Sequence, residues 1–283
     1  MKRTAKAPTV AAPARPVLEL SGPKLGQALE SLVVRTEDYG GVERYVDALK
    51  LKMSLFARAL GEGRARDVDS KTLRQLLSLL ATVRRRIGRY LDARGTDELR
   101  ERIAALLDAG GDAARADEAI AAFCSHCPDD REHRWVRDLA AEVLHNVDPE
   151  RYPLMCRWVW DARANTGVLR EIWHADDVDH VTIGVPDGYE TFVVLREELS
   201  QYLTTNGVYR DVLQYVDLLT AQVYAEYISE QGGSYLRTDF ASPEDPMQHT
   251  RRMLGLDVGP DGRTKLKAVD GNAVVVDAPR LAN

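Results

Sequence analysis

A repeated helical spacing of apolar side chains runs from about residue 23 to residue 146. Its members recur three or four residues apart, which places them on one face of an α-helix. One stretch shows this spacing most fully: Val42, Tyr45, Val46, Leu49, Met53, Phe56 and Leu60. Gly61 follows it, and glycine commonly ends a helix. The spacing predicts an antiparallel array of helices in this stretch and near 70–91, 96–109, 113–125 and 131–146.

Capping residues support the limits of two of these helices. Asp69 or Ser70 offers an N-cap side chain for the helix over 70–91, and Gly95 follows its end. Thr96 caps the next helix, with two acids in its first turn, where the helix macrodipole favours negative charge. We therefore expect short breaks, and no long loops, between the helices.

The second half of the chain has a different pattern. Pro153 cannot lie inside a helix that starts at Asp148-Pro149, so we predict a turn over 148–152 and a new helix from Pro153 to about Asn165. Two long helices are predicted near 188–205 and 208–230.

A small amount of β-structure is expected beside these helices. The run VTIGV (181–185) is a plausible strand. Residues 264–277 alternate around Asp270-Gly271, which is a strong hairpin signal. The predicted fold class is therefore mainly α, an antiparallel helical array or bundle with a small β appendage.

Composition restricts the class of protein. The 283 residues carry a formal net charge of -6, which argues against a general nucleic-acid coat or a binder of anionic membranes. Three cysteines and no long apolar run indicate a reducing compartment and no membrane span, so we expect a cytoplasmic protein. Arginine is far more frequent than lysine, a bias typical of GC-rich bacterial genomes.

The organisation that these patterns predict has four parts. The first is a basic Ala/Pro segment that lacks acids and is expected to be a disordered tail. An N-terminal helical array, an aromatic-rich helical region packed on it and a hairpin arm follow. The predicted boundaries are 1–16, 17–146, 147–258 and 259–283.

Two Glu-x-x-His pairs suggest a metal site. Glu142 and His145 form one pair, and Glu171 and His174 form the other. On a helix, residues three apart share a face, and di-iron bundles use such pairs as ligands. The alternative is ordinary packing, because two pairs also arise by chance in a chain with this many glutamates.

Two further segments contain residues that bind metals. One is the turn around HADDVDH, with candidate ligands Asp176, Asp177, Asp179 and His180. The other is the C-x-x-C pair Cys124 and Cys127. Iron, manganese or zinc would suit these groups. The alternatives are a solvated acidic turn and small buried residues at a helix end.

An aromatic cluster is a candidate partner-binding surface. Its members combine Trp, Tyr and Arg, the residues that dominate interface energetics. They are Tyr152, Arg157, Trp158, Trp160 and Trp173. The alternative is that these aromatic side chains form core, as aromatics at helical spacing commonly do.

The densest basic run contains Arg85 and Arg89, which share a helix face and could contact phosphate. The alternative is a solvated helix face. No P-loop, G-x-G-x-x-G or G-x-S-x-G motif is present.

We therefore expect a non-catalytic helical adaptor or accessory subunit of a larger bacterial complex, without cofactor, that binds a larger protein or itself. A helical metalloprotein with redox or hydrolytic activity and a nucleic-acid-linked regulator are the alternatives.

Overall fold

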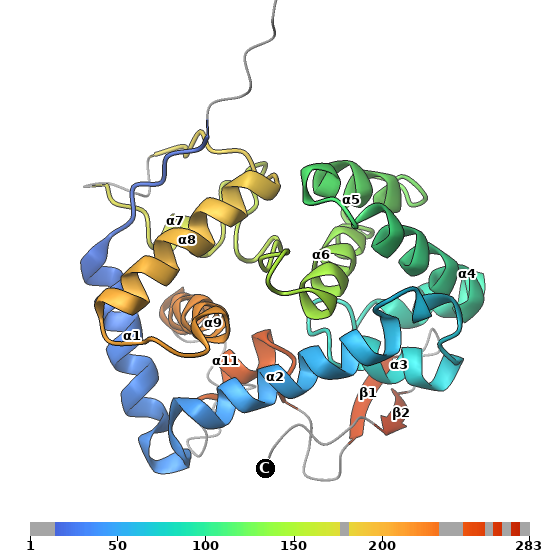
Figure 1. Ribbon diagram of the computed structural model, residues 1–283, viewed down its shortest axis with the longest axis horizontal. Helices are drawn as coiled ribbons and strands as arrows, with labels where there is room; N and C mark the ends of the chain where they lie inside the picture. Colours follow the sequence, from blue (N-terminus) through green and yellow to red (C-terminus); the bar gives the residue numbers. More distant parts are fainter. Residues whose placement is uncertain (1–14, 176–180, 232–245, 258–262, 268–272, 278–283) are drawn as a thin grey trace, which may run out of the picture.

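The computed structural model describes residues 15–175, 181–231, 246–257, 263–267 and 273–277 (Figure 1). Within them the chain is mainly helical, as predicted. The α-helices are α1 (Gly22–Thr36), α2 (Gly41–Leu60), α3 (Ser70–Ser78), α4 (Ile87–Ala109), α5 (Ala116–Cys124), α6 (Trp135–Val147), α7 (Val168–Glu171), α8 (Tyr189–Thr205), α9 (Val212–Gln231) and α11 (Gln248–Met253). The 3₁₀ turns are η1 (Glu37–Tyr39), η2 (Arg64–Arg66) and η3 (Ala113–Arg115). None of the described helices is both long and apolar enough to span a bilayer.

Two helices, α6 and α9, lie at the centres of two groups of helices. Helix α9 contacts α1, α2, α7, α8 and α11, and Figure 1 shows it end-on among several of them. Helix α6 contacts α2, α4 and α5. Both bury residues on more than one face, which is the pattern of a helix surrounded by others. Helix α2 contacts both, so the buried apolar residues join into one core across residue 146.

The predicted single helix over 70–91 is wrong in its middle. Helix α3 ends at Ser78, consecutive turns follow, and α4 begins at Ile87. Leu80 and Val83, which lie in those turns, are fully buried. The leucine-rich pattern therefore predicted the core residues correctly, but Leu80 and Val83 reach the core from turns and not from a helix. Gly95, the expected break, is a non-helical kink within α4.

The predicted helix from Pro153 to Asn165 is also wrong. The amides of Val159 and Trp160 donate to the carbonyl of Cys156, which closes a turn. The carbonyls of Trp158 and Val159 then accept hydrogen bonds from the start of α7, at 3.0 Å each. These acceptors are therefore satisfied by a distant segment and not by the next helical turn.

The segment predicted as a strand, 181–185, has no regular secondary structure and no partner strand among the described residues. The carbonyl of Val185 accepts a hydrogen bond from Trp160 Nε1 at 3.0 Å. The side chain of Asn165 bonds the carbonyl of Val181 and the amide of Ile183, at 3.0 and 3.1 Å. Side chains thus satisfy backbone groups that a neighbouring strand would otherwise bind.

Two strands near the end of the chain pair antiparallel. They are β1 (Arg263–Lys267) and β2 (Ala273–Asp277), with Arg263 opposite Asp277. Both contact α3. The turn predicted at Asp270-Gly271 lies outside the described residues.

Replacement of Trp160 tests whether the aromatic cluster is core. Trp160 is fully buried, so Trp160→Ala is expected to lower the free energy of unfolding by about 3–5 kcal/mol in urea titrations. Tyr209 is 77% exposed, and Tyr209→Ala is expected to change the free energy of unfolding by less than about 0.5 kcal/mol. Equal, small effects of the two changes would contradict the packing described.

Candidate functional site

Four charged side chains meet in the interior of the protein. Lys52 comes from α2, Glu142 and His145 come from α6, and Asp217 comes from α9. Each is 5% exposed or less, although such residues are rarely buried unless they are paired. We call these four residues the buried charge cluster. It is the most unusual chemical feature of the described residues.

Lys52 and Glu142 form one half of the cluster. Lys52 Nζ lies 3.6 Å from Glu142 Oε2 and donates a hydrogen bond of 2.9 Å to the carbonyl of Leu254. Thr82 Oγ1 donates to Glu142 Oε1 at 2.6 Å. Burial lowers the pKa of Lys52, which Glu142 partly offsets, and burial raises the pKa of Glu142. Each member of the pair thus limits the cost of burying the other.

His145 and Asp217 form the other half. His145 Nδ1 donates to the carbonyl of Tyr152 at 2.9 Å, and Nε2 lies 3.0 Å from Asp217 Oδ2. Burial acts to lower the pKa of His145, but the charge and hydrogen bond of Asp217 outweigh it and raise the pKa above its ordinary value. A protonated His145 donates from both ring nitrogens, so this geometry favours an imidazolium–aspartate pair.

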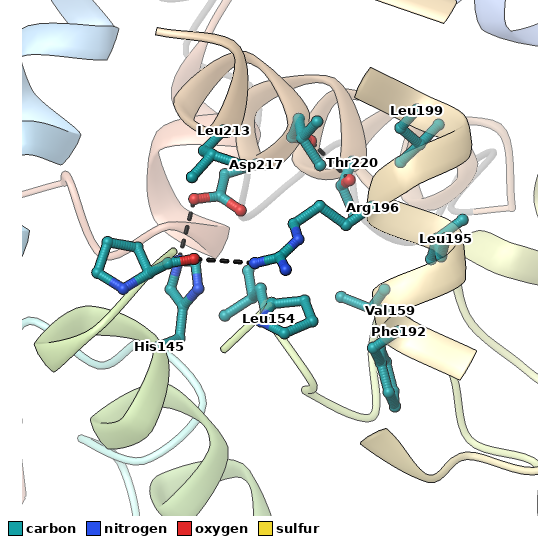
Figure 2. Close-up of a pocket in the computed structure, with 13 residues that line it drawn as sticks. His145, Leu154, Val159, Phe192, Leu195, Arg196, Leu199, Leu213, Asp217 and Thr220 are labelled. Atoms are coloured by element: carbon teal, nitrogen blue, oxygen red, sulfur yellow. Dashed lines mark hydrogen bonds and ion pairs between the residues drawn. The ribbon is translucent and has the colours of Figure 1, made fainter. Parts of the chain in front are cut away.

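Two small cavities flank the His145–Asp217 pair. The first, of about 20 Å³, lies between α8, α9 and the segment after α6, and Arg196 reaches into it (Figure 2). Arg196 donates to the carbonyls of Pro149 and Glu150 at 3.0 and 2.9 Å. The second, of about 10 Å³, also borders Lys52. Each has room for about one water molecule at most, so the cluster is closed to a larger substrate.

The two Glu-x-x-His pairs do not come together as a metal site. Glu142 and His145 lie in the buried charge cluster, where Lys52 and Asp217 are their partners. Helix α7 ends at Glu171, and His174 is exposed with its amide bound to the carbonyl of Glu19. Because the helix stops between them, Glu171 and His174 do not share a helix face.

The other metal candidates form no group of three or more ligands among the described residues. Asp176, Asp177, Asp179 and His180 lie outside the described residues. Cys124 and Cys127 are half-buried at the end of α5, and burial raises the pKa of Cys124 to about 11. Among the residues described, no three His, Cys, Asp or Glu side chains are grouped to hold a metal ion.

Three members of the aromatic cluster are inside the protein, where they cannot form a docking surface. Trp158, Trp160 and Tyr152 are buried, and Trp158 packs against Tyr224 with ring centroids 5.5 Å apart. The remaining two members are partly buried and bind other parts of the chain. Arg157 Nη2 pairs with Asp138 at 2.6 Å, and the half-buried Trp173 forms a β-bridge with Leu20.

Arg85 and Arg89 are exposed, but they do not share a helix face as predicted. Arg85 lies in the turns before α4, and Arg89 lies in the first turn of α4. Their neighbour Arg84 is not part of a phosphate surface. It forms a two-point ion pair with Asp257, at 2.7 and 2.5 Å.

An apolar groove between α4 and α5 was not predicted. It encloses about 410 Å³. Its floor consists of Ala105, Leu106, Ala109, Ala119, Ala122 and Phe123, and its rim consists of Glu98, Glu101, Arg102 and His126. The sequence signal for this groove is the spacing of its alanines, which lie four residues apart on α4 and three apart on α5. Alanine alone does not distinguish a groove from a close helix contact.

Comparisons with protein-family models, curated proteins and solved structures gave no match to the chain. The arguments on function below therefore rest on the chain's own geometry.

Replacement of Asp217 tests the charge state of His145. The pKa of His145 is higher in the folded protein than in the unfolded chain, where it is about 6.5. The protonated histidine therefore contributes its full stabilisation below about pH 6.5, and this contribution is lost as the pH rises through the folded-state pKa. The free energy of unfolding of the wild type should therefore be higher than that of Asp217→Asn. The difference should be largest, about 3 kcal/mol, at about pH 5.5 and smaller at about pH 8.5.

The measurement is urea unfolding of both proteins across that pH range, with His145→Asn as a third protein that lacks the titrating group. A difference between wild type and Asp217→Asn that stays constant with pH would show that His145 is neutral in the folded protein.

Proposed function

We propose that the chain is a non-catalytic adaptor that binds a basic amphipathic helix of a partner protein in the groove between α4 and α5. The observation that carries this proposal is the apolar floor of the groove, which folding leaves open at a volume of about 410 Å³. Exposed apolar hollows of this kind, rimmed by polar residues, mark interaction sites.

The floor suits a helix as its occupant. Four of the six floor residues are alanines, whose short side chains leave room above α4 and α5. Leu106 and Phe123 are buried at its base and offer apolar contact. A third helix can approach such a floor closely and insert larger side chains at positions i, i+3 and i+4, as helices bound in grooves do.

The rim favours positive charge on that helix. Glu101 is 60% exposed, and its nearest cation is the Nε of Arg66, 3.9 Å away. Glu98 is 37% exposed and pairs with Arg94 and Arg102. Arg102 is only 12% exposed and forms an ion pair with Glu98. Among the lining residues, Glu101 and Glu98 are more exposed than Arg102, and this favours lysine and arginine on the partner helix.

The buried charge cluster supports the absence of catalysis in this proposal. Its cavities of about 20 and 10 Å³ admit no organic substrate, and its four side chains are engaged with one another or with protein carbonyls and a hydroxyl. A group with all its hydrogen bonds made inside the protein stabilises the fold and has little left for a ligand.

A labelled peptide tests the groove directly. The probe is a designed amphipathic helix with leucine on one face and lysine on the other, titrated with the full chain by fluorescence anisotropy. Ala122→Trp fills the groove and should weaken binding by about tenfold or more. Ala121→Trp, one residue away on the same helix and outside the groove, should leave binding unchanged.

Charge is tested in the same titration. Glu101→Lys should weaken binding of the lysine-containing peptide. Glu30→Lys on α1 should not, since Glu30 is exposed and is not among the residues that line the groove. Absence of saturable binding to the wild-type chain, or equal losses with both tryptophan variants, would overturn the proposal.

A further inference from the structure

Cys124 and Cys127 lie at the two ends of the turn that follows α5. The amide of Cys127 donates to the carbonyl of Cys124 at 3.0 Å, which closes a 3₁₀-type turn. Side chains three residues apart eclipse in such a turn, and its first and last Cα atoms lie within about 7 Å of each other. A disulfide joins Cα atoms that are about 4.4–6.8 Å apart. The backbone therefore holds the two cysteines at a separation that suits a disulfide.

The residues around the pair fix this turn. Pro128 disfavours helical geometry at Cys127, the residue before it, so the helix does not continue through the pair. The two residues between the cysteines bind back to α5, because Ser125 Oγ and His126 Nδ1 donate to the carbonyl of Ala122 at 2.8 and 3.0 Å. The turn is thus held by contacts that involve neither sulfur atom.

An oxidant in solution can reach this pair but not the third cysteine of the chain. Cys124 and Cys127 are thiols, half-buried beside the exposed Ser125 and His126, whereas Cys156 is fully buried. Thiol oxidation depends on access to the sulfur as well as on its charge state. The chain therefore contains one accessible pair and one buried thiol that serves as an internal reference.

The surroundings of the two accessible sulfur atoms differ. Burial raises the pKa of Cys124 to about 11, and the charge of Cys127 contributes to this rise. Cys127 also interacts electrostatically with the guanidinium of Arg94 and helps to raise the pKa of that group. The thiolate is the form that attacks a disulfide, and a neighbouring cation favours it. Cys127 is therefore the better placed of the two to attack first.

We propose that Cys124 and Cys127 form a redox site that is oxidised by an organic disulfide of low molecular weight. The thiolate of Cys127 attacks one sulfur of that molecule, whose S–S bond breaks, and the sulfur that leaves takes up a proton. Cys124 then loses its proton and attacks the sulfur of Cys127, which releases the second small thiol. Two electrons and two protons thus pass from the protein to the small disulfide, and the reaction does not depend on what the groove binds.

Controlled oxidation of the full chain tests the site. The reduced protein is incubated with oxidised glutathione at neutral pH, the remaining thiols are capped with N-ethylmaleimide in denaturant, and the peptides are identified by mass spectrometry. The wild type should form a bond between Cys124 and Cys127 that dithiothreitol reverses, and Cys156 should carry the maleimide. Cys156→Ala is the matched control and should oxidise as the wild type does.

Single replacements test the order of attack. Cys124→Ser should accumulate a mixed disulfide of glutathione with Cys127. In Cys127→Ser only Cys124 remains, and its pKa of about 11 instead of 9 lowers its thiolate fraction about 100-fold. The higher nucleophilicity of a more basic thiolate recovers roughly tenfold of this loss. The initial rate for Cys127→Ser should therefore be about tenfold lower than that for Cys124→Ser.

Circular dichroism before and after incubation establishes that each protein stays folded. A folded wild type in which both thiols stay reduced would overturn the proposal. So would mixed disulfides on both cysteines without the internal bond, or a disulfide between two chains, seen as a doubled mass without reducing agent. Equal initial rates for the two serine variants would contradict the attack by Cys127.

Discussion

The ion pair between His145 and Asp217 joins the two central helices of the fold. Helix α6 organises one group of helices and α9 organises the other, and this contact ties them at a buried point. Two ions removed from water are costly unless each has a partner, so removal of one partner leaves an uncompensated charge. The pair therefore penalises any packing in which α6 and α9 slide or rotate relative to one another, a constraint that apolar contacts alone impose less strictly.

Lys52 and Glu142 extend this constraint to α2 and to the segment 246–257, which contains α11. Lys52 has three hydrogens to donate, and Glu142 Oε2 is 3.6 Å away, beyond a good hydrogen bond. The carbonyl of Leu254 supplies a bond of 2.9 Å. The segment 246–257 thus supplies a hydrogen-bond acceptor to a side chain buried at the centre of the molecule. This contact couples the packing of that segment to the buried charge cluster.

Local patterns predicted the helices well and the segments between them poorly. Period and caps located α2 and α9 closely, and Asp69 caps α3 through the amides of Lys71 and Thr72 as expected. The segment 153–165 has helical apolar spacing, yet its carbonyls bind the start of α7, a contact that no local rule contains. The Glu171 and His174 pair failed for a related reason, because spacing has meaning only where the helix continues.

The buried charge cluster had a partial signal in the sequence. Lys52 follows Leu49 by three residues and precedes Phe56 by four, which places a charge on the apolar face of its helix. That conflict between residue and position was visible without a structure. Its partner Glu142 has a different signal in the sequence, its spacing from His145. The identity of the partners depended on how α2, α6 and α9 meet, and this is a property of the whole fold.

The described surface and interior differ in what they leave unsatisfied. The cluster combines two cations and two carboxylates with carbonyl and hydroxyl partners, so its charges balance within the protein. The groove between α4 and α5 has apolar atoms that water contacts at a cost and that no described segment covers. A partner gains binding free energy by covering apolar atoms that remain in contact with water after folding. By this criterion the interior holds the molecule together, and the groove is where another molecule gains most by binding.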